Sequence, residues 1–132
     1  MDEARLKSVP LFTGLSKHEL RELARWADEV DVPAGTHLVR EGEFAHEFFA
    51  IEEGTADVLH DDRTLANLGP GDFFGEIALE LDIRRTASVV AISPMRLIVM
   101  FQREFRAMEH EMPEVAVQIR AAIEKRLPGS AG

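Results

Sequence analysis

The pattern of hydrophobic and polar positions divides this chain into helical ends and a β-rich middle. Near the N-terminus, Ser16 is a typical helix N-cap, and Glu19 three positions later completes a capping box. A helix is therefore predicted from Ser16 onward, with a shorter helical segment before it at about residues 3–8. Apolar residues with helical spacing predict the buried side of the main helix: Leu20, Leu23, Ala24 and Ala27.

The middle of the chain, residues 29–101, has short β-favouring segments separated by Gly, Pro or Asp at brief intervals. The segments predicted as strands are residues 30–32, 37–40, 48–51, 56–59, 64–68, 73–74, 87–91 and 96–100. About eight short strands joined by such turns favour an antiparallel jelly roll or barrel.

Helical spacing returns after Gln102 and predicts two helices, at about residues 103–110 and 114–126. Pro113 suits the first position of the second helix, because the N–H that proline lacks would have no intrahelical partner there. The apolar face predicted for this last helix consists of Val115, Ile119, Ala122, Ile123 and Leu127. Because no internal repeat or linker is present, residues 1–132 are predicted to form a single, mainly β domain with flanking helices: a helical segment at 1–28, a barrel at 29–101 and helices at 102–127.

Composition narrows the possible partners. The 132 residues carry 24 acidic and 15 basic side chains, for a net charge of −9, which argues against general affinity for nucleic acid. The chain has no cysteine, so disulfides and thiolate metal sites are excluded. No apolar run approaches the ~20 residues of a membrane helix. The first residues also lack the order of a secretory signal, so we expect a cytoplasmic protein without membrane contact.

Two short stretches carry the candidate chemistry, residues 75–79 (Gly-Glu-Ile-Ala-Leu) and residues 85–89 (Arg-Thr-Ala-Ser-Val). Gly75 has no Cβ and lets an anion approach the backbone closely, and the residues after it are predicted to form a short helical turn whose N–H groups suit a phosphate. The Glu76 carboxylate can accept hydrogen bonds from sugar hydroxyls, and the Arg85 guanidinium offers a planar fork of donors to phosphate oxygens. The pattern therefore predicts a site for a small sugar phosphate.

These stretches resemble the phosphate-binding cassette of cyclic nucleotide-binding domains, where Gly-Glu-aliphatic-Ala-aliphatic is followed, after a short variable stretch, by Arg-small-Ala-Ser/Thr-Val. The resemblance implies a double-stranded β-helix, or jelly-roll barrel, with the cassette at residues 75–88 and its short helix between the sixth and seventh strands. It also implies that Arg85 binds the cyclic phosphate and that Glu76 accepts from the ribose 2′-hydroxyl. A structural salt bridge between Arg85 and Glu76 is the alternative.

The resemblance implies further ligand contacts. The phosphate would be reached by the Thr86 hydroxyl, which suits the base equally well, and by the backbone N–H groups of three residues, Ile77, Ala78 and Ala87. Positions that line the family's base pocket correspond to Val58 and Leu65, with Phe74 behind them, although an ordinary place in the barrel core explains each of the three singly as well. The favoured ligand is cAMP, and cGMP stays open because Thr86 does not decide the base.

Three positions depart from the family's pattern. Arg84 stands where proline or a small residue is frequent, and adds positive charge near the phosphate. Asp82 replaces a glycine that is common after the cassette helix, and Glu80 adds a negative charge that weakens anion binding. None of the three removes a principal contact, but together they lower the affinity that we expect.

Other functions compete with ligand sensing. An enzyme is not expected, and neither is a metal or cofactor, because no serine has a Gly-x-Ser-x-Gly context and the five histidines form no metal-binding motif: His18, His37, His46, His60 and His110. A DNA-binding regulator needs a helix-turn-helix after the last helix, for which the sequence leaves no room. A degenerate, non-binding interaction module and the sensor part of a longer regulator both stay open. A sensor is expected to close its last helix over the base through Ile119 or Ile123, and to act on a protein partner or in a homodimer.

Overall fold

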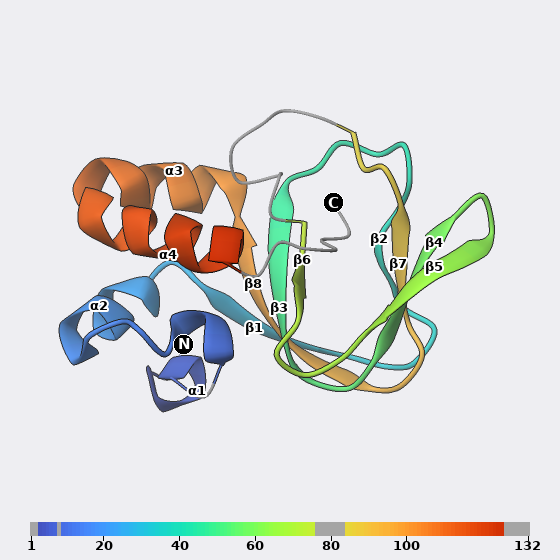
Figure 1. The fold of residues 1–132 in the computed structure, drawn as a ribbon, viewed down its shortest axis with the longest axis horizontal. Coiled ribbons are helices and arrows are strands. Elements are labelled where there is room, and N and C mark those ends of the chain that lie inside the picture. The colour runs from blue at the N-terminus through green and yellow to red at the C-terminus, as the bar shows by residue number, and fades with distance from the viewer. Residues whose placement is uncertain (1–2, 8, 76–83, 126–132) are drawn as a thin grey trace.

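The computed structural model describes residues 3–7, 9–75 and 84–125, and within them the chain is mainly β with helices at both ends (Figure 1). The helices are α1 (Glu3–Lys7), the short 3-10 helix η1 (Pro10–Phe12), α2 (Lys17–Leu23), α3 (Gln102–Glu111) and α4 (Pro113–Lys125). The strands are β1 (Asp28–Val32), β2 (His37–Val39), β3 (Glu47–Glu53), β4 (Ala56–His60), β5 (Arg63–Leu68), β6 (Phe73–Phe74), β7 (Ser88–Ala91) and β8 (Met95–Phe101). Each predicted strand is confirmed, with ends that differ by at most two residues.

The strands form two antiparallel sheets, ordered β1-β8-β3-β6 and β2-β7-β4-β5. Strand β8 lies between β1 and β3, so that Val99 has Asp28 opposite it on one side and Phe49 on the other. Neighbours within each sheet are mostly distant in sequence, as in a jelly roll and unlike a simple meander. The predicted jelly-roll fold is confirmed.

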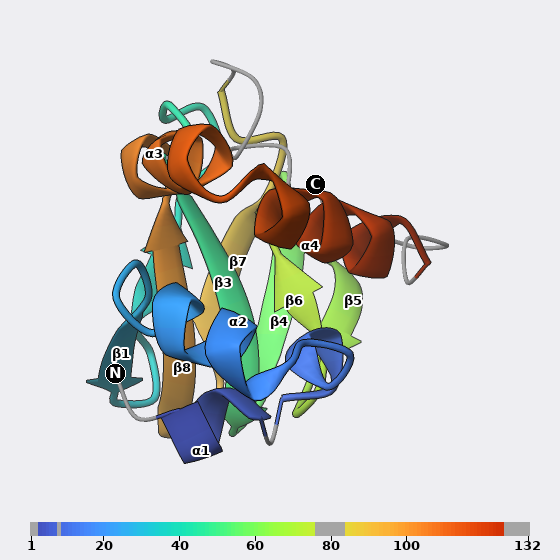
Figure 2. The same cartoon turned by 90° about the vertical axis from the view of Figure 1, so that its left-hand side faces the viewer.

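Strand β3 supplies both hydrophobic cores, because successive side chains of a strand point to opposite faces. Phe49 and Ile51 enter an inner core that joins the two sheets, whereas Phe48 and Ala50 enter an outer core that joins the first sheet to the helices. The inner core consists of Val39, Phe49, Ile51, Ala56, Val58, Phe74, Ala87, Val89, Ala91, Met95, Leu97 and Val99. Figure 2 shows the helices on the viewer's side of the sheet that contains β8, β3 and β6, on the face that the outer core occupies.

The helix ends follow local chemistry. The predicted capping box is present, since the Glu19 N–H donates to Ser16 Oγ at 3.1 Å and the Ser16 N–H donates to Glu19 Oε1 at 2.8 Å. Helix α2 ends at Leu23, earlier than its apolar stripe, because the chain tightens into a turn in which the Trp26 N–H donates to the Leu23 carbonyl at 2.9 Å. Ala27 is nevertheless buried in the outer core, so the stripe predicted burial correctly and helix length too generously.

The last helix begins at Pro113 as predicted, and Val115 and Ile119 of its apolar face are buried in the outer core. Leu127 and the side chains of Ala122 and Ile123 lie outside the part of the chain that the structure describes. Among the described helices, none has the length and apolar character needed to cross a bilayer.

Candidate ligand-binding site

The backbone around Arg85 is fixed by a loop from a distant part of the chain. The Arg85 N–H donates to the Glu43 carbonyl at 2.7 Å, and the Gly42 N–H donates to the Arg85 carbonyl at 2.9 Å. An isolated antiparallel bridge pairs Phe44 with Arg84 beside these bonds. Because both backbone polar groups of Arg85 are bonded to the same loop, the position from which its side chain starts is well defined.

The Arg85 side chain is buried, with 6% of the residue exposed. Its Nη2 donates to the backbone carbonyl of Glu47, at the start of β3, over 2.7 Å. Such a charge-assisted bond helps to hold the planar guanidinium in one orientation. The structure therefore places a buried, oriented positive group at the position that the sequence analysis predicts to bind an anion.

The backbone of Gly75 lies directly against the same guanidinium. Its φ is +80°, in the region that favours glycine, and a Cβ added there would lie 2.6 Å from Nη1 of Arg85 and 2.7 Å from the Glu47 carbonyl oxygen. The sequence prediction explained Gly75 by the close approach of a ligand to the backbone. The structure adds a different reason, since the space that a side chain would need is filled by the guanidinium itself.

Arg84 is held by the loop at 42–44 through its side chain. Its guanidinium carbon lies 4.3 Å from the centre of the Phe44 ring, and its Nη1 donates to the Gly42 carbonyl at 2.7 Å. Stacking and hydrogen bonding together anchor the residues 84–88, which we call the arginine segment, to the loop at 42–44. The positive charge that the sequence placed near the phosphate is therefore engaged in holding the arginine segment in place.

The rest of the arginine segment divides between surface and core. Thr86 is exposed, and its carbonyl oxygen lies 3.2 Å from Nδ1 of His60 at the end of β4. Ala87 is 9% exposed and belongs to the inner core. The Ser88 hydroxyl accepts from the Glu41 N–H at 2.9 Å. His60 and Glu41 had no place in the predicted site, and the pattern of neighbouring residues alone gives no signal for contacts between such distant positions.

The predicted base-pocket residues differ in how much surface they offer. Val58 and Phe74 are fully buried in the inner core, and Phe74 stacks on Phe49 with ring centres 4.8 Å apart, so both act here as core residues. Leu65 is 61% exposed. It also has no partner in the β4–β5 ladder, where the register passes from Val58–Ala66 to Leu59–Thr64. A bulge of this kind redirects a side chain and leaves Leu65 available for contact.

Several predicted contacts cannot be located. Glu76, Ile77 and Ala78, the short cassette helix, and the departures Glu80 and Asp82 all lie outside the described residues. The site that the structure does bring together consists of Gly75, Arg85, Thr86 and Ala87, with Glu47 and the loop at 42–44 as its frame.

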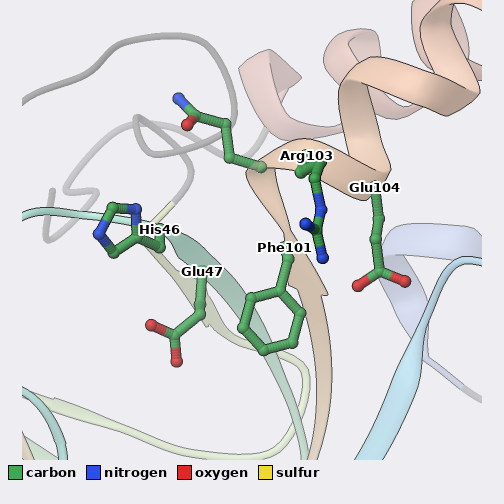
Figure 3. Close-up of a pocket in the computed structure, with 6 residues that line it drawn as sticks. His46, Glu47, Phe101, Arg103 and Glu104 are labelled. Atoms are coloured by element: carbon green, nitrogen blue, oxygen red, sulfur yellow. The ribbon is translucent and has the colours of Figure 1, made fainter.

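An open pocket of about 590 Å³ lies next to this frame, where β3 begins and β8 passes into α3. Figure 3 shows His46 and Glu47 on one side of it, Arg103 and Glu104 on the other, and the Phe101 ring between them. Glu47 contributes its side chain here and its carbonyl to Arg85. Burial raises the pKa of the Glu104 carboxyl above its ordinary value, and the nearby negative charge of Asp28 raises it further.

The chain thus combines a jelly roll that has helices packed on one sheet with a buried arginine beside a glycine of positive φ. The family model described as the cyclic nucleotide-binding domain matches residues 29–111. The chain belongs to this family.

Individual relatives agree with that assignment. A protein from Rhizobium etli named as a cyclic nucleotide-gated potassium channel is 37% identical over 120 residues, which cover 90% of this chain and 34% of the relative. The cyclic AMP receptor protein of Thermus thermophilus is 29% identical over 127 residues, covering 92% of this chain and 59% of the relative. The crystal structure of the N-terminal domain of a transcriptional regulator from Streptomyces coelicolor superposes with a TM-score of 0.78 at 26% identity, covering 93% of this chain and 90% of that one. This chain therefore spans about a third and about three fifths of the two curated relatives.

Proposed function

We propose that residues 1–132 act as one regulatory domain that binds a cyclic nucleotide, with cAMP as the preferred ligand and cGMP as the alternative. The observation that carries this proposal is the buried Arg85 guanidinium, oriented by the Glu47 carbonyl and enclosed by Gly75. A positive group held in one orientation at low exposure supports recognition of a small anion, because little conformational entropy is left to lose on binding.

The ligand chemistry follows from these groups. The cyclic phosphate carries one negative charge, which Arg85 would bind through charge-assisted hydrogen bonds worth about 1.5–3 kcal/mol each. Backbone N–H groups of Ile77, Ala78 and Ala87, and the Thr86 hydroxyl, would complete the phosphate contacts. Glu76 would accept from the ribose 2′-hydroxyl.

The base would lie against Leu65, whose exposed side chain at the β5 bulge gains most from being covered. Val58 and Phe74 would support this surface from within the inner core. Preference for cAMP draws on the Thermus relative, whose name states that ligand. The Thr86 hydroxyl serves adenine or guanine, so the preference is open to direct measurement.

Signal transmission would run through the C-terminal helices. Ile119 is 1% exposed in the outer core, so α4 has to leave part of that core before Ile119 can cover a base. Binding would then shift a population between two positions of α4, by no more than the difference in ligand affinity between them. We expect the moved helix to act on a protein partner or on a second copy of the chain, in the cytoplasm and without catalysis or nucleic-acid binding.

Calorimetric titration tests this function, using protein that has been unfolded and refolded to remove carried-over nucleotide. We expect saturable binding of cAMP, weaker binding of cGMP, and much weaker binding of AMP. The phosphate of AMP is a monoester that carries a second negative charge and is not closed into a ring with the ribose. Absence of binding by all three would favour the alternative of a non-binding interaction module.

A further inference from the structure

His60 connects three separate parts of the chain at the edge of the candidate site. It is the last residue of β4, and its ring is half exposed. Nδ1 lies 2.8 Å from Oε1 of Glu41 and 3.2 Å from the carbonyl oxygen of Thr86, while Nε2 lies 3.4 Å from Oδ2 of Asp61. The contact with Thr86 spans 26 positions and reaches the residue directly after Arg85.

The partners of the two ring nitrogens indicate which protonation state this geometry suits. A carbonyl oxygen only accepts, so Nδ1 has to carry a proton to bond with Thr86. Nε2 faces a carboxylate as well, and an unprotonated Nε2 would direct its lone pair at that negative charge. A ring protonated on both nitrogens faces every one of these oxygens with an N–H, the Nδ1 N–H being shared between Glu41 and Thr86.

Neighbouring charges favour the same state. The hydrogen bond to Glu41, and then the charge of Asp61, raise the pKa of His60 above its ordinary value. The cation nearest in the ladder is Arg63, which is the β5 residue directly opposite His60. A metal ion is a poorer explanation for the cluster of Glu41, His60 and Asp61, although their ligand atoms lie within 4.8 Å of one another. One metal ion would bind a single ring nitrogen together with both carboxylates. Here Glu41 lies at Nδ1 and Asp61 at Nε2, on different sides of the ring.

The contacts of His60 belong to the frame that holds the arginine segment. Glu41, which bonds to the His60 ring, also donates its N–H to the Ser88 hydroxyl. The next residue, Gly42, donates to the carbonyl of Arg85. These contacts hold the arginine segment at three residues: at Arg85 and Thr86 through backbone carbonyls, and at Ser88 through its hydroxyl. His60 supplies the contact in the middle.

We propose that His60 is a positioning residue for the arginine segment, and that its protonated ring strengthens binding of an anionic cyclic nucleotide to that segment. This inference rests on the proposed function. An imidazolium holds the Thr86 carbonyl more firmly than a neutral ring does, and it offsets the negative charges of Glu41 and Asp61, which otherwise oppose a phosphate.

The direction of the pH dependence follows from linkage. An anion bound beside the arginine segment favours the charged ring, so the bound protein holds the His60 proton more tightly than the free protein. Affinity is therefore highest where His60 is protonated in both states, and it falls as the pH rises through the titration of the ring.

The positioning contact can be tested without any ligand. In the NMR spectrum of the isotope-labelled protein, the amide resonances of Thr86 and Ala87 should shift with pH along the titration curve of the His60 ring. His60→Gln should abolish that shift, whereas His37→Gln, which changes an exposed histidine on β2, should leave it intact. Resonances of Thr86 and Ala87 that do not follow the ring titration would overturn the positioning role.

The effect on binding is tested by calorimetry with cAMP at about pH 6 and about pH 8, where histidine changes charge. We expect the dissociation constant of the unaltered protein to rise about fivefold between these values, the low end of typical coupling between sites. His60→Gln should give nearly equal constants, and His37→Gln should behave like the unaltered protein. A fivefold change that persists in His60→Gln would assign the pH dependence to another group and overturn the proposal.

Asp61→Asn provides a second variant that keeps the ring. Asp61 has a φ of +50°, which asparagine tolerates, so the backbone should be preserved while one negative charge is lost. The midpoint of the affinity change should then move to lower pH, and an unmoved midpoint would contradict the role of the His60 charge. Failure of cAMP to bind at either pH would overturn the proposed function and the binding half of this inference, while the NMR titration would still decide whether His60 positions Thr86.

Discussion

The Arg85 guanidinium fills the space that a side chain at position 75 would need, and Gly75 leaves that space open. A Cβ at position 75 would lie 2.6 Å from Nη1 of Arg85, well inside van der Waals contact. The backbone at position 75 and the buried guanidinium are therefore compatible only if residue 75 has no side chain. The Glu47 carbonyl oxygen accepts from Arg85 and would lie 2.7 Å from the same added Cβ, so these three residues behave as one structural unit.

Gly75→Ala should destabilise this unit and weaken ligand binding together. The substitution adds a left-handed backbone strain to a collision with the guanidinium, and we expect a loss of roughly 2–4 kcal/mol in the free energy of unfolding, measured with urea.

Two other glycines provide controls for that measurement. Gly42 has a φ of +87° with nothing within 4 Å of an added Cβ, so Gly42→Ala should show the cost of backbone strain alone, about 1 kcal/mol. Gly14 has open space and no positive φ, and Gly14→Ala should cause almost no loss. Equal losses for Gly75→Ala and Gly42→Ala would show that contact with Arg85 contributes nothing.

Arg84 should matter for rigidity rather than for direct ligand contact. Arg84→Ala removes its stacking on Phe44 and its bond to the Gly42 carbonyl, and we expect the unfolding free energy to fall by about 1 kcal/mol. Hydrogen exchange of the Arg85 and Gly42 N–H groups should become faster, because these bonds join the same loop to the arginine segment. Arg84→Lys keeps the charge but loses the planar stack, so its unfolding free energy and exchange rates should lie between those of Arg84→Ala and the unaltered protein. Unchanged exchange rates in both variants would contradict the bracing role of Arg84.

Local patterns predicted the elements of this fold well. Each strand follows a run of β-favouring residues bounded by turn residues, and the capping box at Ser16 and Glu19 forms as its spacing indicates. The end of α2 was less predictable, because Ala24 and Ala27 are buried whether or not the helix continues.

The site itself was predictable only in part. Arg85 and Gly75 were identified through a motif, whereas the carbonyl of Glu47 belongs to the backbone and leaves no trace in residue type. The contacts of His60 with Thr86 and of Arg84 with Gly42 join distant positions, and they depend on how the sheets fold together. For Val58 and Phe74 the sequence left a base-pocket role and an ordinary core place both open, because residue type does not distinguish them, and the structure buries both in the inner core.

Glu104 should make stability depend on pH. Its carboxyl pKa is raised in the folded protein, so its favourable contribution is fully present below the pKa of the unfolded chain and is lost as the pH rises through the folded value. Glu104→Gln removes that loss. The variant should therefore melt at a higher temperature than the unaltered protein at neutral pH, and the difference should shrink in acid. Glu111→Gln, which changes an exposed residue of the same helix, is the control; a lower melting temperature of Glu104→Gln at neutral pH would contradict this account.

The affinity of cAMP for two adjacent arginine variants tests the central claim most directly. Arg85→Ala and Arg84→Ala remove the same charge from neighbouring positions, but Arg85 is buried beside Gly75 and bonds to the Glu47 carbonyl, whereas Arg84 is exposed and stacks on Phe44. Measured by calorimetry, Arg85→Ala should weaken binding by about a hundredfold, as expected when one partner of a buried charge pair is removed, and Arg84→Ala by only a few-fold. Equal losses in the two variants, or unchanged affinity in Arg85→Ala, would contradict the assignment of Arg85 as the phosphate-binding residue.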